Sequence, residues 1–348
     1  MKRAVVAAIS LMTGLTMLTG CSKAEVEETI QPLVADAIEE SDSEAEAVDE
    51  QDESPLIPEI DTDVKIEAGS RIAVVSKSVK GEYWKMVKKG MEDAVKAIND
   101  AYGFKKDDQI TMTFEGPDNE EDVESQINTI DAVIAENPDV LCISASDMDS
   151  CQAQLEAAKE NEIPVVAFDS NVSEKKLVKA YRGTDNVQVG KMAAYQLGSA
   201  LGKMGKVAVF SAQQKTKSVQ DRVEGFMNNI GKYGDIEVVE TIYSDQVDDM
   251  ETAMKEVLDK YPALDGVFCT NADVTELYLG LEKSDASDAP ALVGVDATTK
   301  QQEAIRNGEE IGCVSQQPYA MGYQTIWTAA ETTAPKKSVT IEKNLLLN

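Results

Sequence analysis

The feature that most constrains the fold is an alternation of short apolar runs with longer helical patterns, which begins at Arg71. In the segment "EDVESQINTIDAVIAENPD", for example, apolar residues recur at intervals of three and four, as one face of a helix requires. Near-continuous apolar strands separated by such helices indicate parallel sheets that are covered on both faces. The predicted strands are 71–76, 110–116, 140–144, 164–169, 179–183, 206–211, 236–243, 266–271, 291–296 and 311–316.

The length of this alternating region indicates two domains. About 280 residues are too many for one sheet of ordinary size, and the pattern runs twice, with a break near "RGTDNVQVG". We therefore predict an α/β protein with two doubly wound parallel-sheet lobes.

The N-terminus has the features of an export signal. Residues 1–20 carry Lys2 and Arg3, then an apolar stretch that is short for a membrane span, then small residues before Cys21. The tetrad "LTGC" resembles the lipobox of bacterial lipoproteins, which are cleaved before the cysteine and acylated on it. We expect lipidation of Cys21 and an extracytoplasmic location on the outer face of the bacterial cytoplasmic membrane. The alternative is an ordinary secretory signal followed by an incidental cysteine.

Residues 21–69 are strongly acidic. Between Ser22 and Ser70 there are 17 acidic residues and two lysines, and the whole chain has a formal charge of −30. Such a segment repels itself and favours solvent, so we predict a disordered tether after Cys21. The negative charge also argues against nucleic acid as a partner, because phosphates would be repelled.

The remaining cysteines are Cys142, Cys151, Cys269 and Cys313, and three of these lie within predicted strands. Buried structural thiols are favoured over disulfides or metal ligation, because no pair has zinc-type spacing and the chain contains no histidine. The lack of histidine also removes the commonest general base. We therefore expect no metal, no cofactor and no enzymatic activity.

Ligands of open α/β sheets bind at the carboxyl ends of the strands. The residues that follow the predicted strands are polar apart from two adjacent aromatic residues in "GEYWK", and no phosphate-binding glycine loop follows a strand. Carboxylates, amides and a guanidinium suit vicinal hydroxyl groups, and aromatic faces cover the C–H side of a sugar ring. The set comprises Lys77, Tyr83, Trp84, Ser144, Ser146, Asp147, Asp169, Ser170, Gln213, Ser218, Arg222, Asn271, Asp273, Asp296 and Gln316.

From Arg71 onward the chain resembles the ribose and galactose type of periplasmic binding protein, the extracytoplasmic receptors of ABC importers. The resemblance rests on five segments in the family's order and spacing: "GTDNVQVG", "QDRVEGF", "GVFCTNAD", "ALVGVDATT" and "CVSQQPYAMG". It implies the type I fold, in which three chain crossings form a hinge between the lobes. It also implies a sugar ligand, a partner permease with its ATPase, and a monomer.

The resemblance implies specific ligand contacts. Tyr83 and Trp84 match aromatics that stack on the sugar; alternatively they are a staple that fixes the first helix against the sheet. The other matched positions would bind hydroxyl groups, with loop or helix capping as the alternative role. These positions are Ser144, Asp169, Arg222, Asn271, Asp296 and Gln316, with Lys77, Asp147, Ser170 and Ser218 as possible secondary contacts.

Three positions depart from the family pattern. Gly81 and Ser144 stand where asparagine is usual, and Val247 stands where the second lobe often supplies an aromatic residue. These departures leave the identity of the sugar open.

The crossings are expected near residues 183–186, 316–318 and 335–338. The N-terminal lobe would then comprise residues 70–183 and 318–336, and the C-terminal lobe residues 184–317 and 337–348.

Three other functions are alternatives to sugar import. A sugar-responsive transcription regulator would need an N-terminal basic helix-turn-helix, and an enzyme would need a base or nucleophile. A receptor for a sensor kinase or chemoreceptor, or for a furanose signal, is left open beside nutrient import.

Overall fold

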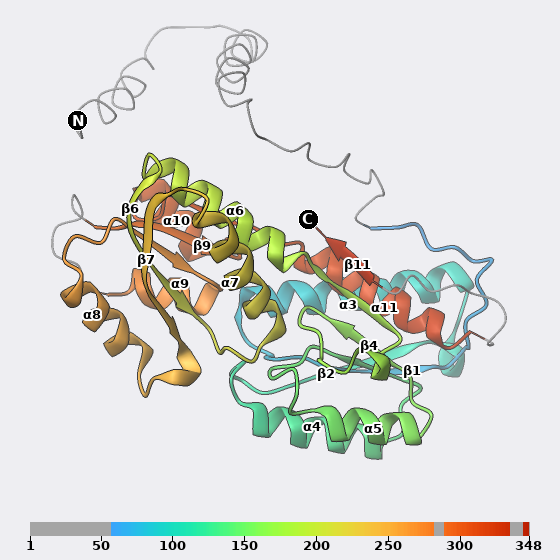
Figure 1. The fold of residues 1–348 in the computed structure, drawn as a ribbon. Coiled ribbons are helices and arrows are strands. Elements are labelled where there is room, and N and C mark those ends of the chain that lie inside the picture. Colours follow the sequence, from blue (N-terminus) through green and yellow to red (C-terminus); the bar gives the residue numbers. More distant parts are fainter. Residues whose placement is uncertain (1–56, 282–288, 335–343, 348) are drawn as a thin grey trace, which may run out of the picture. The chain divides into compact units, whose positions relative to one another are not determined.

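The computed structural model describes residues 57–281, 289–334 and 344–347. Two parallel sheets are present in this part of the chain, one of six strands and one of five (Figure 1). All ten strands predicted from the sequence are confirmed, with ends that differ by at most a few residues. The two-lobed α/β prediction is therefore confirmed.

The first sheet has the strand order β11-β5-β4-β3-β1-β2. Its members are β1 (Arg71–Val75), β2 (Thr111–Glu115), β3 (Val140–Ile143), β4 (Val165–Phe168), β5 (Ala180–Thr184) and β11 (Asn344–Leu347). Alternate residues of β1 and β3 face opposite sides. Ile72 and Val74 pack under α3 (Gly81–Tyr102) and α11 (Pro318–Thr332), whereas Ala73 and Val75 pack under α4 (Val123–Ala135) and α5 (Gln152–Glu160).

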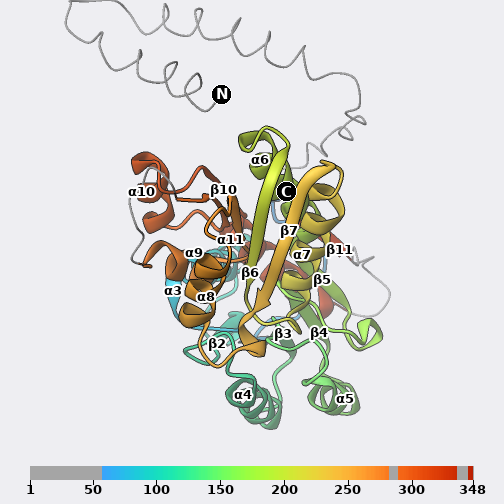
Figure 2. The ribbon, with the colours of Figure 1, turned by 60° about the vertical axis from the view of Figure 1, so that its left-hand side comes forward.

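The second sheet has the order β10-β9-β8-β6-β7, and its long strands β6 and β7 lie side by side in Figure 2. Its strands are β6 (Met204–Ser211), β7 (Asp235–Tyr243), β8 (Gly266–Cys269), β9 (Ala291–Val295) and β10 (Gly312–Val314). One face is covered by α6 (Asn186–Ala200) and α7 (Lys217–Ile230), the other by α8 (Met250–Lys260) and α9 (Ala272–Leu279). α10 (Thr299–Asn307) follows β9 and begins with a capping box formed by Thr298 and Gln301.

Three short 3₁₀ turns complete the described structure, at Lys106–Asp108, Lys175–Leu177 and Ser244–Gln246. None of the described helices is long and apolar enough to cross a membrane.

The chain passes from β5 of the first lobe directly into α6 of the second, and from β10 back into α11 of the first. The Thr184 hydroxyl donates to Oε1 of Gln316 at 2.7 Å and joins these two crossings. The third expected crossing, at 335–338, lies outside the described residues.

Two predicted boundaries are wrong. Residues 344–347 form β11, which pairs with β5 in the first sheet and not with the second lobe. Residues 57–69, expected to belong to the tether, lie against the first lobe: Ile60, Val64 and Ile66 pack on its core, and Tyr102 donates to the carbonyl of Val64 at 2.6 Å. Both segments are short, and their apolar residues carry no helical or strand period that could be read from sequence. Cys21 and residues 21–56 lie outside the described residues.

Each lobe contains two helices that touch through paired glycines. A Cβ built on Gly90 of α3 would lie 2.0 Å from the Tyr319 carbonyl oxygen, and one built on Gly322 of α11 would lie 2.2 Å from that of Val87. Gly190 of α6 and Gly225 of α7 make the same reciprocal contact in the second lobe, each at 2.0 Å. The backbones of these helices can approach this closely only because glycine has no side chain.

The substitution Gly90→Ala should therefore destabilise the protein by about 1–3 kcal/mol, because the added methyl group forces α3 away from α11. Urea unfolding of purified protein measures this difference. Gly234→Ala is the control, since a Cβ there meets no atom within 4 Å, and it should leave the unfolding free energy nearly unchanged. Equal stability of the two variants would show that the helix pair does not need the close contact.

Candidate functional site

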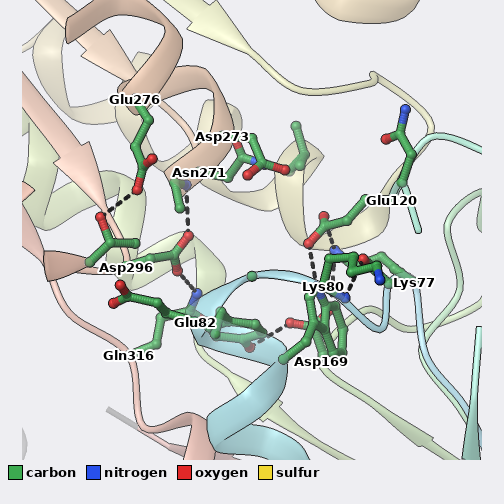
Figure 3. Close-up of a pocket in the computed structure, with 18 of the residues that line it drawn as sticks. Lys77, Lys80, Glu82, Glu120, Asp169, Asn271, Asp273, Glu276, Asp296 and Gln316 are labelled. Carbon is green, nitrogen blue, oxygen red and sulfur yellow. Dashed lines mark hydrogen bonds and ion pairs between the residues drawn. The ribbon is translucent and has the colours of Figure 1, made fainter. Parts of the chain in front are cut away.

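A cavity of about 410 Å³ lies between the lobes at the carboxyl ends of the strands (Figure 3). Most of its first-lobe lining comes from the loop after β1, the first turn of α3 and the loop after β2. Its second-lobe lining comes from α7, the first turns of α9 and the segment after β9. The lining residues are Lys77, Ser78, Lys80, Gly81, Glu82, Tyr83, Trp84, Asp118, Asn119, Glu120, Asp169, Val219, Arg222, Asn271, Ala272, Asp273, Glu276, Asp296, Thr298 and Gln316.

Most of the residues expected to contact a ligand meet in this cavity. Seven of the eight primary candidates line it, namely Tyr83, Trp84, Asp169, Arg222, Asn271, Asp296 and Gln316, and so does the secondary candidate Lys77. Ser144 lies behind the lining and donates to Oδ2 of Asp169 at 2.8 Å.

Asp147, Ser170 and Ser218 do not line the cavity, contrary to expectation. Ser170 Oγ accepts from the Ser218 backbone N–H at 3.3 Å across the two lobes. The Asp147 carboxylate accepts from the N–H groups of Asp149 and Ser150 in its own loop. These three follow the predicted strands in sequence, but their side chains are used by contacts beside the cavity.

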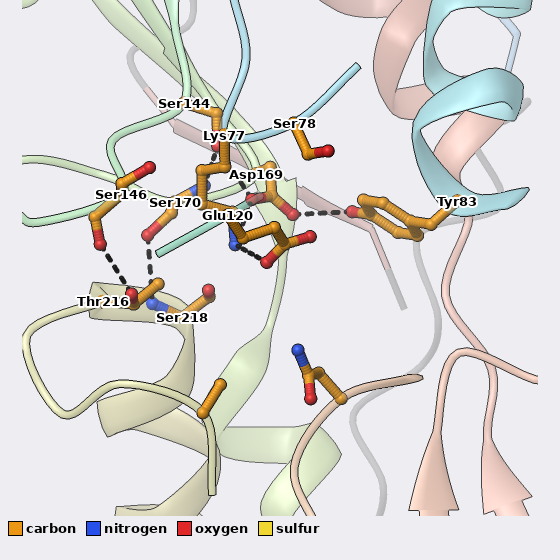
Figure 4. A network of polar contacts seen from close by, with 12 residues as sticks. Lys77, Ser78, Tyr83, Glu120, Ser144, Ser146, Asp169, Ser170, Thr216 and Ser218 are labelled. Atoms are coloured by element: carbon orange, nitrogen blue, oxygen red, sulfur yellow. Dashed lines mark hydrogen bonds and ion pairs between the residues drawn. The ribbon is translucent and has the colours of Figure 1, made fainter. Parts of the chain in front are cut away.

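A buried ion cluster forms the first-lobe wall of the cavity (Figure 4). The Lys77 ammonium lies 3.1 Å from Oδ2 of Asp169 and 3.3 Å from Oε2 of Glu120. Oδ1 of Asp169 accepts the Tyr83 hydroxyl at 2.7 Å. Burial raises the pKa of Asp169, but the Lys77 charge, the Tyr83 hydroxyl and the Arg222 charge outweigh it, so the pKa lies below its usual value. Asp169 is therefore ionised at neutral pH, and its carboxylate oxygens accept hydrogen bonds.

Tyr83 and Trp84 do not form a parallel stacking platform. Their ring planes meet at 86°, with centroids 5.2 Å apart. Trp84 is only 3% exposed, packs edge-on against Phe168 at 6.3 Å and donates from Nε1 to Glu120 at 2.6 Å. The structure thus gives both residues a packing role in the first turn of α3 and, at the same time, a place in the cavity lining.

Asp296 is a half-buried carboxylate of the second-lobe wall. It accepts from the backbone N–H of Ala272 at 2.8 Å and from the side-chain amide of Gln316. Its own φ of 95° lies in the left-handed region, which a residue other than glycine adopts at a cost of about 1–3 kcal/mol. Burial raises the pKa of Asp296, although Arg222 and these hydrogen bonds oppose the rise.

Arg222 lies in the second turn of α7 and is 4% exposed. Its Nε donates to Oδ1 of Asn186 at 2.8 Å and its guanidinium donates to the carbonyl of Thr270 at 2.7 Å. Asn271 caps α9, since its side chain accepts from the N–H of Val274 at 3.1 Å. For Asn271 the capping role considered as an alternative is thus present together with its place in the lining.

Several lining residues were not predicted from the sequence. Asp118, Asn119 and Glu120 lie in the loop after β2. The rule that ligands bind at the carboxyl ends of the strands applies to this loop too, but the predicted set contains no residue from it. Glu276 lies one helical turn after Asp273, so the i, i+3 spacing from "NADVTE" could have indicated it. Glu82, beside Tyr83, accepts from the N–H and hydroxyl of Thr299 of the other lobe at 3.0 and 3.1 Å.

The cavity carries more negative than positive charge. Its lining holds seven carboxylates and three cationic side chains. Partial burial, with Glu120, Asp296 and Glu276 nearby, raises the pKa of Asp273 to about 6. An acidic ligand would meet this excess of negative charge, whereas a neutral ligand with many hydroxyl groups finds numerous acceptors and three donors.

The second lobe supplies no aromatic residue to the described lining of the cavity. Val247, the residue at the position expected for one, lies at the end of a 3₁₀ turn after β7 and is not part of the lining. Among the described residues, no three histidine, cysteine, aspartate or glutamate side chains are grouped to hold a metal ion.

Comparisons with known proteins agree with this geometry. A model of the periplasmic binding protein domain matches residues 72–337. The chain is 28% identical over 207 residues to the ribose import binding protein of Bacillus subtilis, covering 59% of this chain and 66% of that protein. It is 24% identical over 227 residues to the xylitol-binding protein of Mycolicibacterium smegmatis, and this alignment covers 65% of this chain and 61% of that protein. The alignments thus span slightly less than two thirds of the relatives' own lengths.

Solved structures show the same similarity. A carbohydrate-transporter solute-binding protein from Agrobacterium radiobacter, in complex with D-arabinose, matches with a TM-score of 0.71 and 26% identity. The match covers 81% of this chain and 92% of that one. An ABC transporter solute-binding protein from Agrobacterium vitis, with bound D-fucose, matches with a TM-score of 0.71 and 27% identity, covering 80% and 93%.

The substitution Lys77→Met should destabilise the protein by about 3–5 kcal/mol at neutral pH, because it leaves the buried Asp169 charge without its cation. The lowered pKa of Asp169 means that the wild-type contribution is present above the unfolded pKa of about 3.9 and is lost as pH falls through the folded pKa. The difference between variant and wild type should therefore shrink in acid. Urea unfolding at several pH values measures it.

Lys80→Met is the matched control. Lys80 also lines the cavity, but its side chain is 65% exposed and its partner Asp118 is 76% exposed, at 3.5 Å. We expect a change within about 1 kcal/mol. A Lys77→Met variant as stable as this control would contradict the role of the ion cluster.

Proposed function

The chain belongs to the periplasmic binding protein family, and from that premise we propose that it captures a sugar or related polyhydroxylated molecule between its lobes and delivers it to an ABC transporter permease. The observation that carries this proposal is the cavity at the strand ends of both sheets, lined from each lobe by polar side chains that can hydrogen-bond to hydroxyl groups. The proposal is of binding and not of catalysis.

The hydrogen-bonding capacity of the wall supports a polyhydroxylated ligand. A carboxylate has about four acceptor positions. Asp169 uses three of them on Lys77, Tyr83 and Ser144, and Asp296 uses two on Ala272 and Gln316. Each carboxylate can therefore accept a ligand hydroxyl group while its own position stays fixed by the protein, so no ordering of these side chains is needed on binding.

Contacts between the lobes support closure around the ligand. The Thr216 hydroxyl donates to the Ser146 carbonyl at 2.6 Å. The side-chain amide of Gln213 donates to the backbone carbonyl of Glu120 at 3.2 Å. Glu82 accepts from Thr299 at the other side of the cavity. We propose that the lobes rotate about the crossings at 184–186 and 314–318, and that a ligand touching both walls favours the closed state.

The named functions of the relatives support import. They are described as a ribose import binding protein and a solute-binding protein of a carbohydrate transporter, so import is favoured over a receptor for a sensor kinase or chemoreceptor. A permease and its ATPase are the partners we propose, with the protein acting as a monomer.

We also propose that Cys21 is lipidated and holds the protein on the outer face of the bacterial cytoplasmic membrane. The support is the sequence "LTGC" after an export signal, followed by an acidic segment. Acyl chains contribute about 0.8 kcal/mol per buried CH₂, so several chains suffice for stable anchoring.

A thermal-shift screen of purified protein against pentoses, hexoses, disaccharides and polyols tests the binding proposal. A ligand at 100 times its Kd should add about 2.7 kcal/mol of stability. Asp296→Asn, which keeps the shape but loses the charge, should weaken binding about 10- to 100-fold in calorimetry, because hydrogen bonds to charged groups contribute about 1.5–3 kcal/mol. Glu237→Gln on the exposed face of β7 is the control and should bind as wild type.

Tryptophan fluorescence gives an independent readout, because the chain has two tryptophans. Trp84 lines the cavity, whereas Trp327 belongs to α11 and packs in the core of the first lobe. A ligand-dependent change should persist in Trp327→Phe and disappear in Trp84→Phe. The binding proposal fails if no saccharide or polyol raises the melting temperature or changes the emission.

Lipidation is tested by labelling expressing cells with radioactive palmitate. Wild-type protein should incorporate the label and sediment with membranes, whereas Cys21→Ser should do neither. Cys151→Ser is the control, since Cys151 is 2% exposed within the first lobe. Equal labelling of wild type and Cys21→Ser would exclude the anchor.

A further inference from the structure

A second cavity of about 220 Å³ adjoins the first. Five residues line both cavities and form their common boundary: Asn119, Glu120, Val219, Asn271 and Asp273. In Figure 3, Asn271 and Asp273 lie on the second-lobe side of this boundary and Glu120 faces them from the first lobe. Most of the expected sugar contacts line the first cavity. The second cavity therefore extends the cleft beyond these contacts.

Within this boundary, the Asp273 side chain is not fixed in place by the protein. Asn119 and Asp273 are partly exposed to solvent. Within the described residues, no hydrogen bond or ion pair fixes the Asp273 carboxylate, in contrast to Asp169 and Asp296. Asp273 can therefore turn toward a ligand group that passes from one cavity to the other, and can accept a hydrogen bond from it.

The second cavity has a different lining from the first. The first is lined by many charged and amide side chains besides its two aromatic residues, whereas the second has an apolar wall formed by Ala212, Met250, Val274 and Leu277. The lining also contains polar residues, among them Gln213 and Ser244. A wall of this kind suits a group with one apolar face, and it would otherwise be left in contact with water.

The size of the second cavity limits what can occupy it. At roughly 30 Å³ per water molecule, 220 Å³ holds about seven water-sized groups. This is room for a short alkyl group or part of a second sugar ring, joined to a larger ring in the first cavity. The cavity also lies between the lobes, because Gln213 donates to the Glu120 carbonyl and Ser244 to the Glu121 carboxylate across it.

We propose that the preferred ligand is a glycoside, whose sugar ring occupies the first cavity and whose linked group occupies the second. The inference rests on the proposed function and narrows its ligand class. The apolar face of the linked group packs on Met250, Val274 and Leu277, while the glycosidic linkage passes between Glu120 and Asp273. A free monosaccharide fills only the first cavity.

Calorimetry with the purified full chain tests the proposal with matched probes. The probes are D-galactose, D-glucose, D-ribose and D-arabinose, each compared with its methyl and butyl glycosides, together with lactose and maltose. For the sugar that binds, at least one glycoside or disaccharide should have a Kd at least tenfold below that of the parent monosaccharide.

Variants that fill the second cavity test its contribution to glycoside affinity separately from that of the first cavity. Leu277→Trp and Met250→Trp start from half-buried residues and should remove the tenfold advantage of the glycoside, while the monosaccharide Kd changes less than twofold. Leu279→Trp is the control on the same helix, since Leu279 is half-buried but lines neither cavity, and it should keep the advantage. Two filling variants protect the test against misfolding of one.

Two outcomes overturn the inference and are distinguishable. If monosaccharides bind as tightly as every glycoside and disaccharide, and the filling variants change neither Kd, the inference is wrong while the proposed function stands. If no saccharide binds at all, the proposed function fails, and the inference fails with it.

Discussion

The burial of both faces of each parallel sheet determines where a binding site can form in this protein. Helices cover the faces of each sheet, so polar side chains that must meet a ligand can stand only at the strand ends. In the first lobe this edge carries Lys77 and Asp169, and in the second it carries Asn271 and Asp296. The sheet topology thus sets the position of the site, and the residues at the strand ends determine which ligands it can bind.

The two walls of the cleft differ in how their charges are held. On the first lobe, Lys77 is ion-paired with both Asp169 and Glu120, and Tyr83 and Ser144 complete the hydrogen bonding of Asp169. On the second lobe, backbone and amide groups hold Asp296, and Asp273 keeps a raised pKa. The first wall is therefore preorganised, whereas the second holds carboxylates whose raised pKa values reflect an unfavourable environment for their charge.

Much of this structure could be predicted from the sequence, because parallel strands and amphipathic helices leave a strong periodic pattern. The positions of β1, β6 and β9, and the meeting of Asp169 with Arg222 and Asp296 in one cavity, follow from that pattern and the strand-end rule. β11 could not be predicted, since four residues carry too little pattern to show which sheet they join. Side-chain directions were also beyond the sequence: Ser170 and Asp147 follow strands as Asp169 does, yet they are used in local and interlobe contacts.

The burial of the thiols has a practical consequence for watching the lobes move. Cys142 and Cys151 are at most 2% exposed, burial raises the pKa of Cys151 to about 12, and that of the half-buried Cys313 is raised to about 11. Only the thiolate reacts readily with maleimides, so these native positions stay silent under ordinary labelling conditions. A pair of cysteines introduced on exposed helices, one in each lobe, would then carry a donor and an acceptor dye without removal of these core thiols. Distance changes across the cleft become measurable in single molecules of an almost unaltered protein.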